Sequence, residues 1–251
     1  MTRHTDTVDI AGIAFRLSCP FPKPGFWARR RPEFITPNRP DVIVRIDYDE
    51  RFARRGVVAD TVADAAAVSR RGQGLLVSTG YYRATVDVPR GRAAVRIAAG
   101  FDVASLMRTL AALWLAECGT VLLRAACFGA GESATLACGL PDWTTPPSAT
   151  RGWLAVAPRR GRVEVRPTPF LDHAGDPRER WRAADLWMPG PVDEPSIGGA
   201  WALRALLPSI WQSDRRRPAV ERTLDLATRV ATSLRCRAIA AANLQDEAAV
   251  G

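Results

Sequence analysis

Residues Phe128–Ala137 read FGAGESATLA, and they directly follow an apolar run, TVLLRAACF, at positions 120–128. A phosphate-binding loop consists of a strand, a glycine-rich turn and a helix that starts directly after the turn. The sequence therefore predicts a strand, a glycine loop and a helix in this order, with Ser133 capping the helix. The residues of the predicted loop are Gly129, Gly131, Glu132, Ser133 and Thr135.

Glu132 occupies the position at which a working loop of the form G-x-x-x-x-G-K-[ST] has its lysine. The lysine neutralises phosphate charge, whereas two like charges about 4 Å apart repel by roughly 4 kcal/mol at a protein-like effective dielectric. Lys23 is the only lysine in the chain, so another lysine cannot readily take over this role. We therefore interpret the loop as degenerate and expect no bound cofactor or metal ion.

The segments around the loop indicate a protein of mixed α and β structure. In the first hundred residues, β-branched runs between turn residues predict a meander of strands, and helical spacing of leucines predicts a helix at 103–118. The same patterns predict later strands and helices at 153–158, 162–167, 200–211, 220–234 and 236–241. Residues 174–199 are rich in Pro, Gly and Asp, which favours a long connection with one helical turn.

We divide the chain into a β-rich N-terminal module, residues 1–100, and a second domain, residues 101–251, that carries the glycine loop. The length of 251 residues, with 47% hydrophobic and 24% charged residues, is typical of a globular protein. Five cysteines without C-x-x-C spacing favour reduced thiols in a core over a zinc site. The chain contains no apolar run of membrane-spanning length, and we expect a cytoplasmic protein that does not bind membranes.

The formal net charge of +9 comes almost entirely from arginine. Such a charge would allow binding to nucleic acid. However, the arginines are scattered over predicted strands, turns and helices, and no aromatic platform or reader motif accompanies them. We therefore do not expect nucleic acid to be the partner.

Taken in order, several segments resemble the HPr serine kinase/phosphorylase family, specifically its stand-alone members associated with the biosynthesis of modified peptides. These segments are SLMRTLAALWL, TVLLRAA, GAGESATLA, the strand pair ending in RPTPF, and ERTLDLATRVATSLRCRAI. The similarity extends over most of the chain. It implies an α+β or α/β fold in which the β-rich N-terminal module packs on a P-loop-like mixed sheet with flanking helices.

The resemblance also implies a catalytic set that this chain lacks. Arg124 stands where the family's strand carries histidine, Glu132 replaces the lysine, and Arg151 lies where an acidic pair would bind the metal. Phosphoryl transfer depends mostly on charge neutralisation and positioning, so these losses together predict an inactive site. We expect a pseudokinase that binds a protein or peptide as a scaffold or regulator, in a setting such as peptide natural-product biosynthesis.

Two alternatives stay open at this point. The first is a nucleotide-dependent kinase that phosphorylates a peptide or small molecule through a rearranged site, with Arg124 or Arg151 replacing the lysine. In that case Asp142 or another carboxylate would hold the metal. The second is a basic nucleic-acid-binding protein, and only the net charge supports this interpretation. The sequence does not decide the oligomeric state, and an oligomer is compatible with all of these functions.

We expect the partner to bind away from the glycine loop, on two long segments with little strand or helix signal, residues 21–34 and 181–187. Long loops in compact domains are often functional, and aromatic and arginine side chains supply many interface hot spots. The alternative is that these aromatic side chains pack on the protein's own core. The candidate partner-binding residues are Phe26, Trp27, Arg29, Arg30, Arg31, Trp181 and Trp187.

Overall fold

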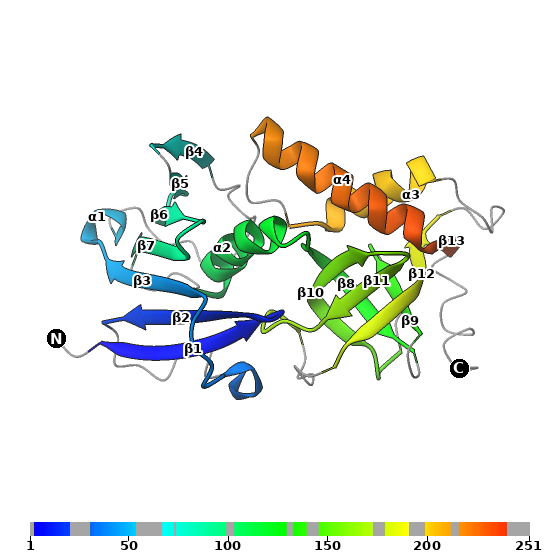
Figure 1. Ribbon diagram of the computed structural model, residues 1–251, viewed down its shortest axis with the longest axis horizontal. Helices are drawn as coiled ribbons and strands as arrows, with labels where there is room; N and C mark the ends of the chain where they lie inside the picture. Colours follow the sequence, from blue (N-terminus) through cyan, green and yellow to red (C-terminus); the bar gives the residue numbers. More distant parts are fainter. Residues whose placement is uncertain are drawn as a thin grey trace. The chain divides into compact units, whose positions relative to one another are not determined.

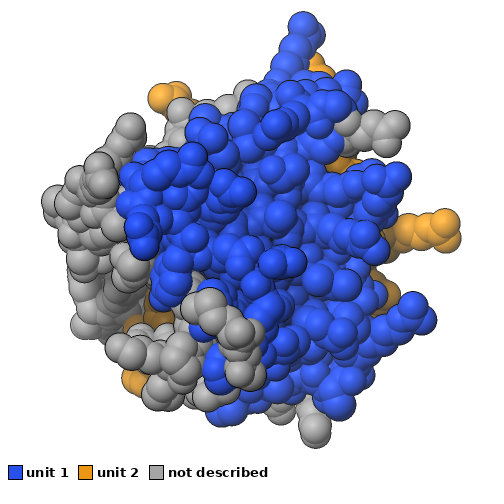
Figure 2. Space-filling view, turned by 90° about the vertical axis from the view of Figure 1, so that its left-hand side faces the viewer, with its two compact units in different colours: residues 1–114, 212–220 blue, residues 115–211, 221–251 orange. Residues whose placement is uncertain are grey.

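The structure is a computed structural model that describes residues 3–20, 31–53, 67–72, 74–98, 103–129, 133–139, 146–172, 179–190, 199–211 and 216–239. Within these residues, thirteen strands form two mixed sheets, and helices occur alongside them, so the protein has mixed α and β structure (Figure 1). The chain forms two compact units (Figure 2). Unit 1 comprises residues 1–114 and 212–220, and unit 2 comprises residues 115–211 and 221–251. The first division lies inside helix α2 (Val103–Glu117) rather than at residue 100.

Unit 1 is built on a seven-stranded sheet with the strand order β1-β2-β3-β7-β6-β5-β4. Its strands are β1 (His4–Ile10), β2 (Ile13–Cys19), β3 (Val42–Tyr48), β4 (Ala67–Arg71), β5 (Gly74–Ser78), β6 (Tyr82–Asp87) and β7 (Arg92–Ile97). The strands β2, β3 and β7 run parallel to one another, so the predicted simple meander is wrong. After β3 and the short helix α1 (Glu50–Ala53), the chain resumes at the far edge strand β4 and returns strand by strand to β7 beside β3. A parallel neighbour requires such a crossover.

One face of this sheet is apolar because alternate residues of each strand point to the same side. Helix α2 packs against this face: Trp114 meets Phe15 edge to face at 5.8 Å between ring centroids, and its indole N–H donates to the Val88 carbonyl. The helix predicted at 103–118 is thereby confirmed, and Gly119, with φ 68°, follows its end. The opposite face of the sheet carries the exposed residues of the central strands.

Unit 2 contains the second sheet, in the order β11-β10-β8-β9-β12-β13. Its strands are β8 (Val121–Phe128), β9 (Ala134–Cys138), β10 (Thr150–Arg159), β11 (Arg162–Arg166), β12 (Trp181–Pro189) and β13 (Arg235–Ile239). Because β11 also pairs with β12, five of these strands close into a small barrel, and β13 adds to β12 (Figure 1). The strands predicted at 120–128, 153–158 and 162–167 are confirmed, and the strand predicted at 236–241 is confirmed over its described residues, 236–239.

Strand β12 lies where the sequence predicts a long connection with one helical turn, and that prediction is wrong for residues 181–189. The strand pairs with β9 on one side, and on the other side first with β11 and then with β13. Its register with β9 shifts between Ala183 and Asp185. Such a bulge moves later residues to the other face, so the alternation that identifies a strand in a sequence is broken.

The remaining elements are helical. They are the 3-10 turns η2 (Pro32–Phe34) and η4 (Leu207–Ser209) and the helices α3 (Gly199–Leu206) and α4 (Arg217–Ser233). The helix predicted at 200–211 ends at Leu206, because Pro208 cannot continue an α-helix and the chain tightens into η4. The helix predicted at 220–234 is confirmed as α4. Among the helices of the described residues, none has the length and apolar character needed to cross a membrane.

Candidate functional site

The predicted glycine loop connects two strands of one hairpin. Strand β9 pairs antiparallel with β8, with Phe128 opposite Thr135. The helix predicted after the loop is therefore wrong, and Ser133 precedes a strand instead of capping a helix. Only residues 134–138 lie between the loop and Gly139, which has φ 69° and ends the segment. Five residues are too few for a stable helix but sufficient for a buried strand.

This arrangement removes the anion site of a phosphate loop at residues 134–138. In a phosphate loop, the N–H groups at the start of the helix have no helical partners and point at the anion. Strand β9 instead lies between β8 and β12 and pairs with both, so its N–H groups take part in the sheet. Gly129 follows β8, whereas Gly131 and Glu132 lie outside the described residues.

Strand β12 brings a carboxylate next to the threonine of the predicted loop. Asp185 lies opposite Thr135 of β9 and opposite Arg235 of β13. Its Oδ2 accepts a hydrogen bond from Arg235 at 2.9 Å, while its buried Oδ1 has no hydrogen-bond partner within the described residues. Sequence reasoning missed Asp185 because residues 181–189 lack a regular strand pattern. Arg235 already neutralises this carboxylate, so the pair joins β12 to β13.

The two arginines at the predicted catalytic positions lie on neighbouring strands. Arg124 is an exposed residue of β8, opposite Trp153 of β10. Arg151 lies on β10 and donates to the Pro146 carbonyl oxygen at 3.0 Å. This hydrogen bond ties Arg151 to the loop that precedes its own strand. Asp142 lies outside the described residues.

The predicted partner-binding residues lie partly outside the described residues. Trp187 of β12 meets Phe128 edge to face at 5.3 Å and packs beside a small cluster of buried alanines, so it contributes to the core of unit 2. Trp181 is the first residue of β12 and is partly buried. Arg31 lies 4.0 Å from Glu33 at η2. The four residues that the structure does not describe are Phe26, Trp27, Arg29 and Arg30.

The cysteines differ in exposure. Three are buried, namely Cys19, Cys127 and Cys138, whereas Cys236 is partly buried and Cys118 is exposed, so the prediction of core thiols is wrong for Cys118. Burial raises the pKa of Cys127 to about 12 and also raises the pKa of Cys138. All five are free thiols.

These differences predict a single fast thiol in the native protein. Because the thiolate is the reactive form, a pKa of about 12 leaves roughly one thiolate in ten thousand at pH 8 for Cys127, and burial also blocks the reagent. With a chromogenic disulfide reagent, Cys118 should react at once, and Cys127 and Cys138 should react only after denaturation. The variant Cys118→Ser should lose the fast phase. A fast phase that survives in this variant would show that one of the other four cysteines is more accessible than the structure places it.

The outward face of the unit 1 sheet carries a dense group of arginines, which we call the arginine face. It is formed by alternate residues of the four strands β2, β3, β7 and β6. Its arginines are Arg16, Arg45, Arg83, Arg92 and Arg96, and its carboxylates are Asp47 and Asp87. The sequence shows the alternation within each strand, but sequence analysis did not identify the face because it left the strand order unknown.

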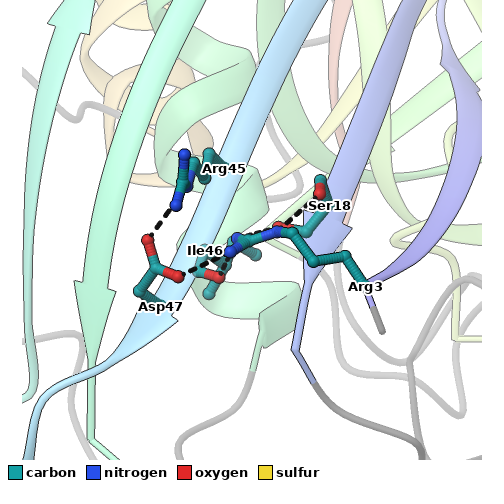
Figure 3. Close-up of polar contacts among 5 residues, drawn as sticks. All are labelled: Arg3, Ser18, Arg45, Ile46 and Asp47. Atoms are coloured by element: carbon teal, nitrogen blue, oxygen red, sulfur yellow. Dashed lines mark hydrogen bonds and ion pairs between the residues drawn. The ribbon is translucent and has the colours of Figure 1, made fainter. Parts of the chain in front are cut away.

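Ion pairs at the edges of this face use its carboxylates. Asp47 accepts hydrogen bonds from Arg3 at 2.9 Å and from Arg45 at 3.2 Å (Figure 3). Arg3 also donates to the side chain and carbonyl of Ser18 and to the Ile46 carbonyl, so it ties β2 to β3 (Figure 3). Asp87 pairs with Arg90 at 3.2 Å.

Asp49, just after β3, is held by two more arginines. Arg51 donates two side-chain hydrogen bonds to it, and Arg96 lies 3.8 Å away. The hydrogen bonds from Arg51, with further attraction from both arginines, lower the pKa of Asp49 to about 2. The carboxylate is therefore ionised at any physiological pH, and it balances only part of the charge of the face.

Three arginines of the face are left without an ion pair among the described residues: Arg16, Arg83 and Arg92. They are exposed, and each comes from a different strand. The face is therefore a positively charged surface on a rigid sheet. In the described part of the chain, no cluster of His, Cys, Asp and Glu side chains could hold a metal ion. No protein-family model and no curated protein matches the chain.

Proposed function

We propose that the chain is a non-catalytic relative of the HPr kinases that binds a protein or peptide partner. The observation that carries the proposal is strand β9, which continues the glycine loop as part of a sheet and so leaves no helix N-terminus for a phosphate. The resemblance in segment order, with Arg124, Glu132 and Arg151 at the catalytic positions, supports the assignment to a degenerate member of that family.

An enzymatic function through a rearranged site receives less support from the contacts. Such a site needs a carboxylate near the loop that can bind a metal ion. Asp185 is the carboxylate that lies opposite Thr135, and it is engaged by Arg235. A binding function needs none of these groups, and the arginine face offers a surface for it in unit 1. The partner would use this protein as a scaffold or regulator.

Nucleotide binding tests the proposal directly. In calorimetry with magnesium and ATP, the wild-type protein should show no saturable binding at sub-millimolar concentration. The variant Glu132→Lys should also fail to bind, because a lysine supplies charge but not the converging N–H groups of a helix start. Glu132→Gln serves as the control for removing the negative charge alone.

Two results would contradict this proposal. One is saturable sub-millimolar binding of ATP to the wild type or to Glu132→Lys, which would mean that the loop can still form a phosphate site. The other is phosphoryl transfer that Gly131→Asp abolishes. Either result would favour the alternative of a kinase with a rearranged site.

A further inference from the structure

We propose that the arginine face is the docking surface for an acidic segment of the partner, and that this segment inserts an apolar side chain between its carboxylates. The inference rests on the proposed binding function and adds the chemistry of the partner and the place where it binds. The register of the strands, the exposure of the side chains and the charges on the face support it.

An exposed isoleucine lies within the arginine face. Ile43 of β3 is 41% exposed, and its register places Arg16 of β2 on one side and Arg92 of β7 on the other. Neighbouring strands are about 4.8 Å apart, so the two arginines start about 10 Å apart with the isoleucine between them. A ligand that fits this row has an apolar group flanked by two negative charges.

A second small residue extends the apolar spot. Ala94 of β7 is exposed and lies opposite Arg45 of β3. Along its own strand Ala94 has Arg92 on one side and Arg96 on the other, each two residues away, which places all three on the same face. Ile43 and Ala94 are thus surrounded by arginines on both strands. The centres of protein interfaces are apolar and enriched in arginine, as this spot is.

The register places both opposite and like charges across from each other on the face: Asp47 lies opposite Arg96 and Asp87 lies opposite Arg92. Arg83 of β6 lies directly opposite Arg96 of β7, and like charges opposite each other in a sheet are destabilising. Arg96 is 64% exposed and its nearest carboxylate, Asp49, is 3.8 Å away, so that pair is weak. A ligand carboxylate would relieve this repulsion. The complementary charge of the occupant is therefore negative.

The chemistry of the face favours an acidic protein segment over nucleic acid. Proteins that bind single strands stack bases on several aromatic side chains, whereas the described residues of β2, β3, β6 and β7 include one exposed aromatic residue, Tyr48 at the end of β3. By the alternation of β3, Tyr48 is out of phase with the outward-facing Ile43, Arg45 and Asp47. Ile43 within the arginine face would bury apolar surface against an apolar group of the partner, and a phosphate backbone has no such group.

The test uses the full chain and a fluorescein-labelled peptide with one leucine between two Glu-Asp-Glu runs, measured by fluorescence anisotropy at low salt. Exposed ion pairs are each worth a few tenths to one kcal/mol, so Arg16→Ser with Arg92→Ser should weaken binding by about tenfold. The matched control is Arg159→Ser with Arg160→Ser, which removes two exposed arginines from unit 2 and should change affinity less than about twofold. All variants should keep the thermal midpoint of the wild type.

The apolar contact has its own readout. Ile43→Ser should lower the affinity for the leucine peptide several-fold. A peptide with serine in place of leucine should bind the wild type as weakly as the leucine peptide binds Ile43→Ser. The Ile43→Ser variant with the serine peptide should lose little more affinity than either change alone, since both changes remove the same contact. Binding should weaken between low and physiological salt, because exposed charges are screened.

Three outcomes would overturn the proposal. An equal loss of peptide affinity in the Arg16/Arg92 variant and in the Arg159/Arg160 variant would mean that only net charge matters. Full additivity of Ile43→Ser and the serine peptide would mean that the isoleucine does not contact the leucine. Tighter binding of an oligothymidylate with the same number of negative charges, lost in the Arg16 and Arg92 variant, would assign the face to nucleic acid. The ATP experiment decides the non-catalytic function separately, so failure of the peptide test alone would leave it standing with another docking surface.

Discussion

Replacing Gly152 with alanine is expected to lower the free energy of unfolding by about 3 kcal/mol or more. Gly152 lies in β10 with φ 124°, a backbone conformation that costs an ordinary residue about 1–3 kcal/mol. A Cβ at this position would lie 2.7 Å from the Leu171 Cα and 2.9 Å from the Phe170 carbonyl oxygen. These are backbone atoms, so the segment that follows β11 would have to move away from β10.

Gly161 provides the matched control for this substitution. It lies in the turn between β10 and β11 with φ 68°, and a Cβ added there would meet no described atom within 4 Å. Gly161→Ala should therefore cost only the backbone strain, about 1–2 kcal/mol. Urea denaturation of the wild type and the two variants measures the difference. Equal losses for the two glycines would show that residues 170–172 do not pack against β10 as described.

Replacing Thr168 with valine is expected to cost about 2–4 kcal/mol in unfolding free energy. The Thr168 side chain is fully buried, and its hydroxyl donates to the Trp153 carbonyl oxygen. The Thr168 hydroxyl oxygen also accepts a hydrogen bond from the Phe170 N–H at 3.2 Å. Valine has a similar shape but cannot make either hydrogen bond. Two buried backbone groups would lose their partner, at about 1–3 kcal/mol each before any relaxation.

Thr168→Ser separates the hydroxyl from the methyl group. Serine keeps both hydrogen bonds and loses one methyl group, which is worth about 1 kcal/mol. Chemical denaturation should therefore rank the valine variant well below the serine variant. The reverse order would mean that packing of the methyl group, and not the hydrogen bonds, holds this segment.

Gly152 and Thr168 act on the same piece of structure. Both hold the residues after β11 against β10, through the N–H of Trp153 donating to Phe170 and the N–H of Asp172 donating to Arg151. The RPTPF motif within this piece is one of the segments that resemble the HPr kinases. The proposed non-catalytic function requires this framework and not the glycine loop, because binding depends on the folded surface.

The arginine face changes how the charge of the protein is understood. From the sequence, the arginines are scattered and carry no information about a partner. The sheet collects arginines from residues 16–96 on one surface, because β7 lies between β3 and β6. The surface predicted at residues 21–34 stays a prediction, since most of that segment lies outside the described residues.

The sequence by itself determined the elements whose pattern is local. Leucines at helical spacing predicted α2, apolar residues on one side predicted α4, and continuous apolar runs predicted β8 and β10. Each of these segments is long or regular enough for its own periodicity to specify the structure. The degenerate phosphate loop, inferred from Glu132 at the lysine position, stays a prediction, because Glu132 lies outside the described residues.

Only the tertiary structure decided the elements that depend on distant neighbours. Residues 134–138 are too short to show a period, and they become a strand because β8 and β12 pair with them on both sides. The bulge in β12 hides its alternation, and three partner strands supply the hydrogen bonds that stabilise it. The arginine face exists only because the crossover after β3 sets the strand order. Strand pairing is a long-range interaction, so a local pattern does not encode which strands meet.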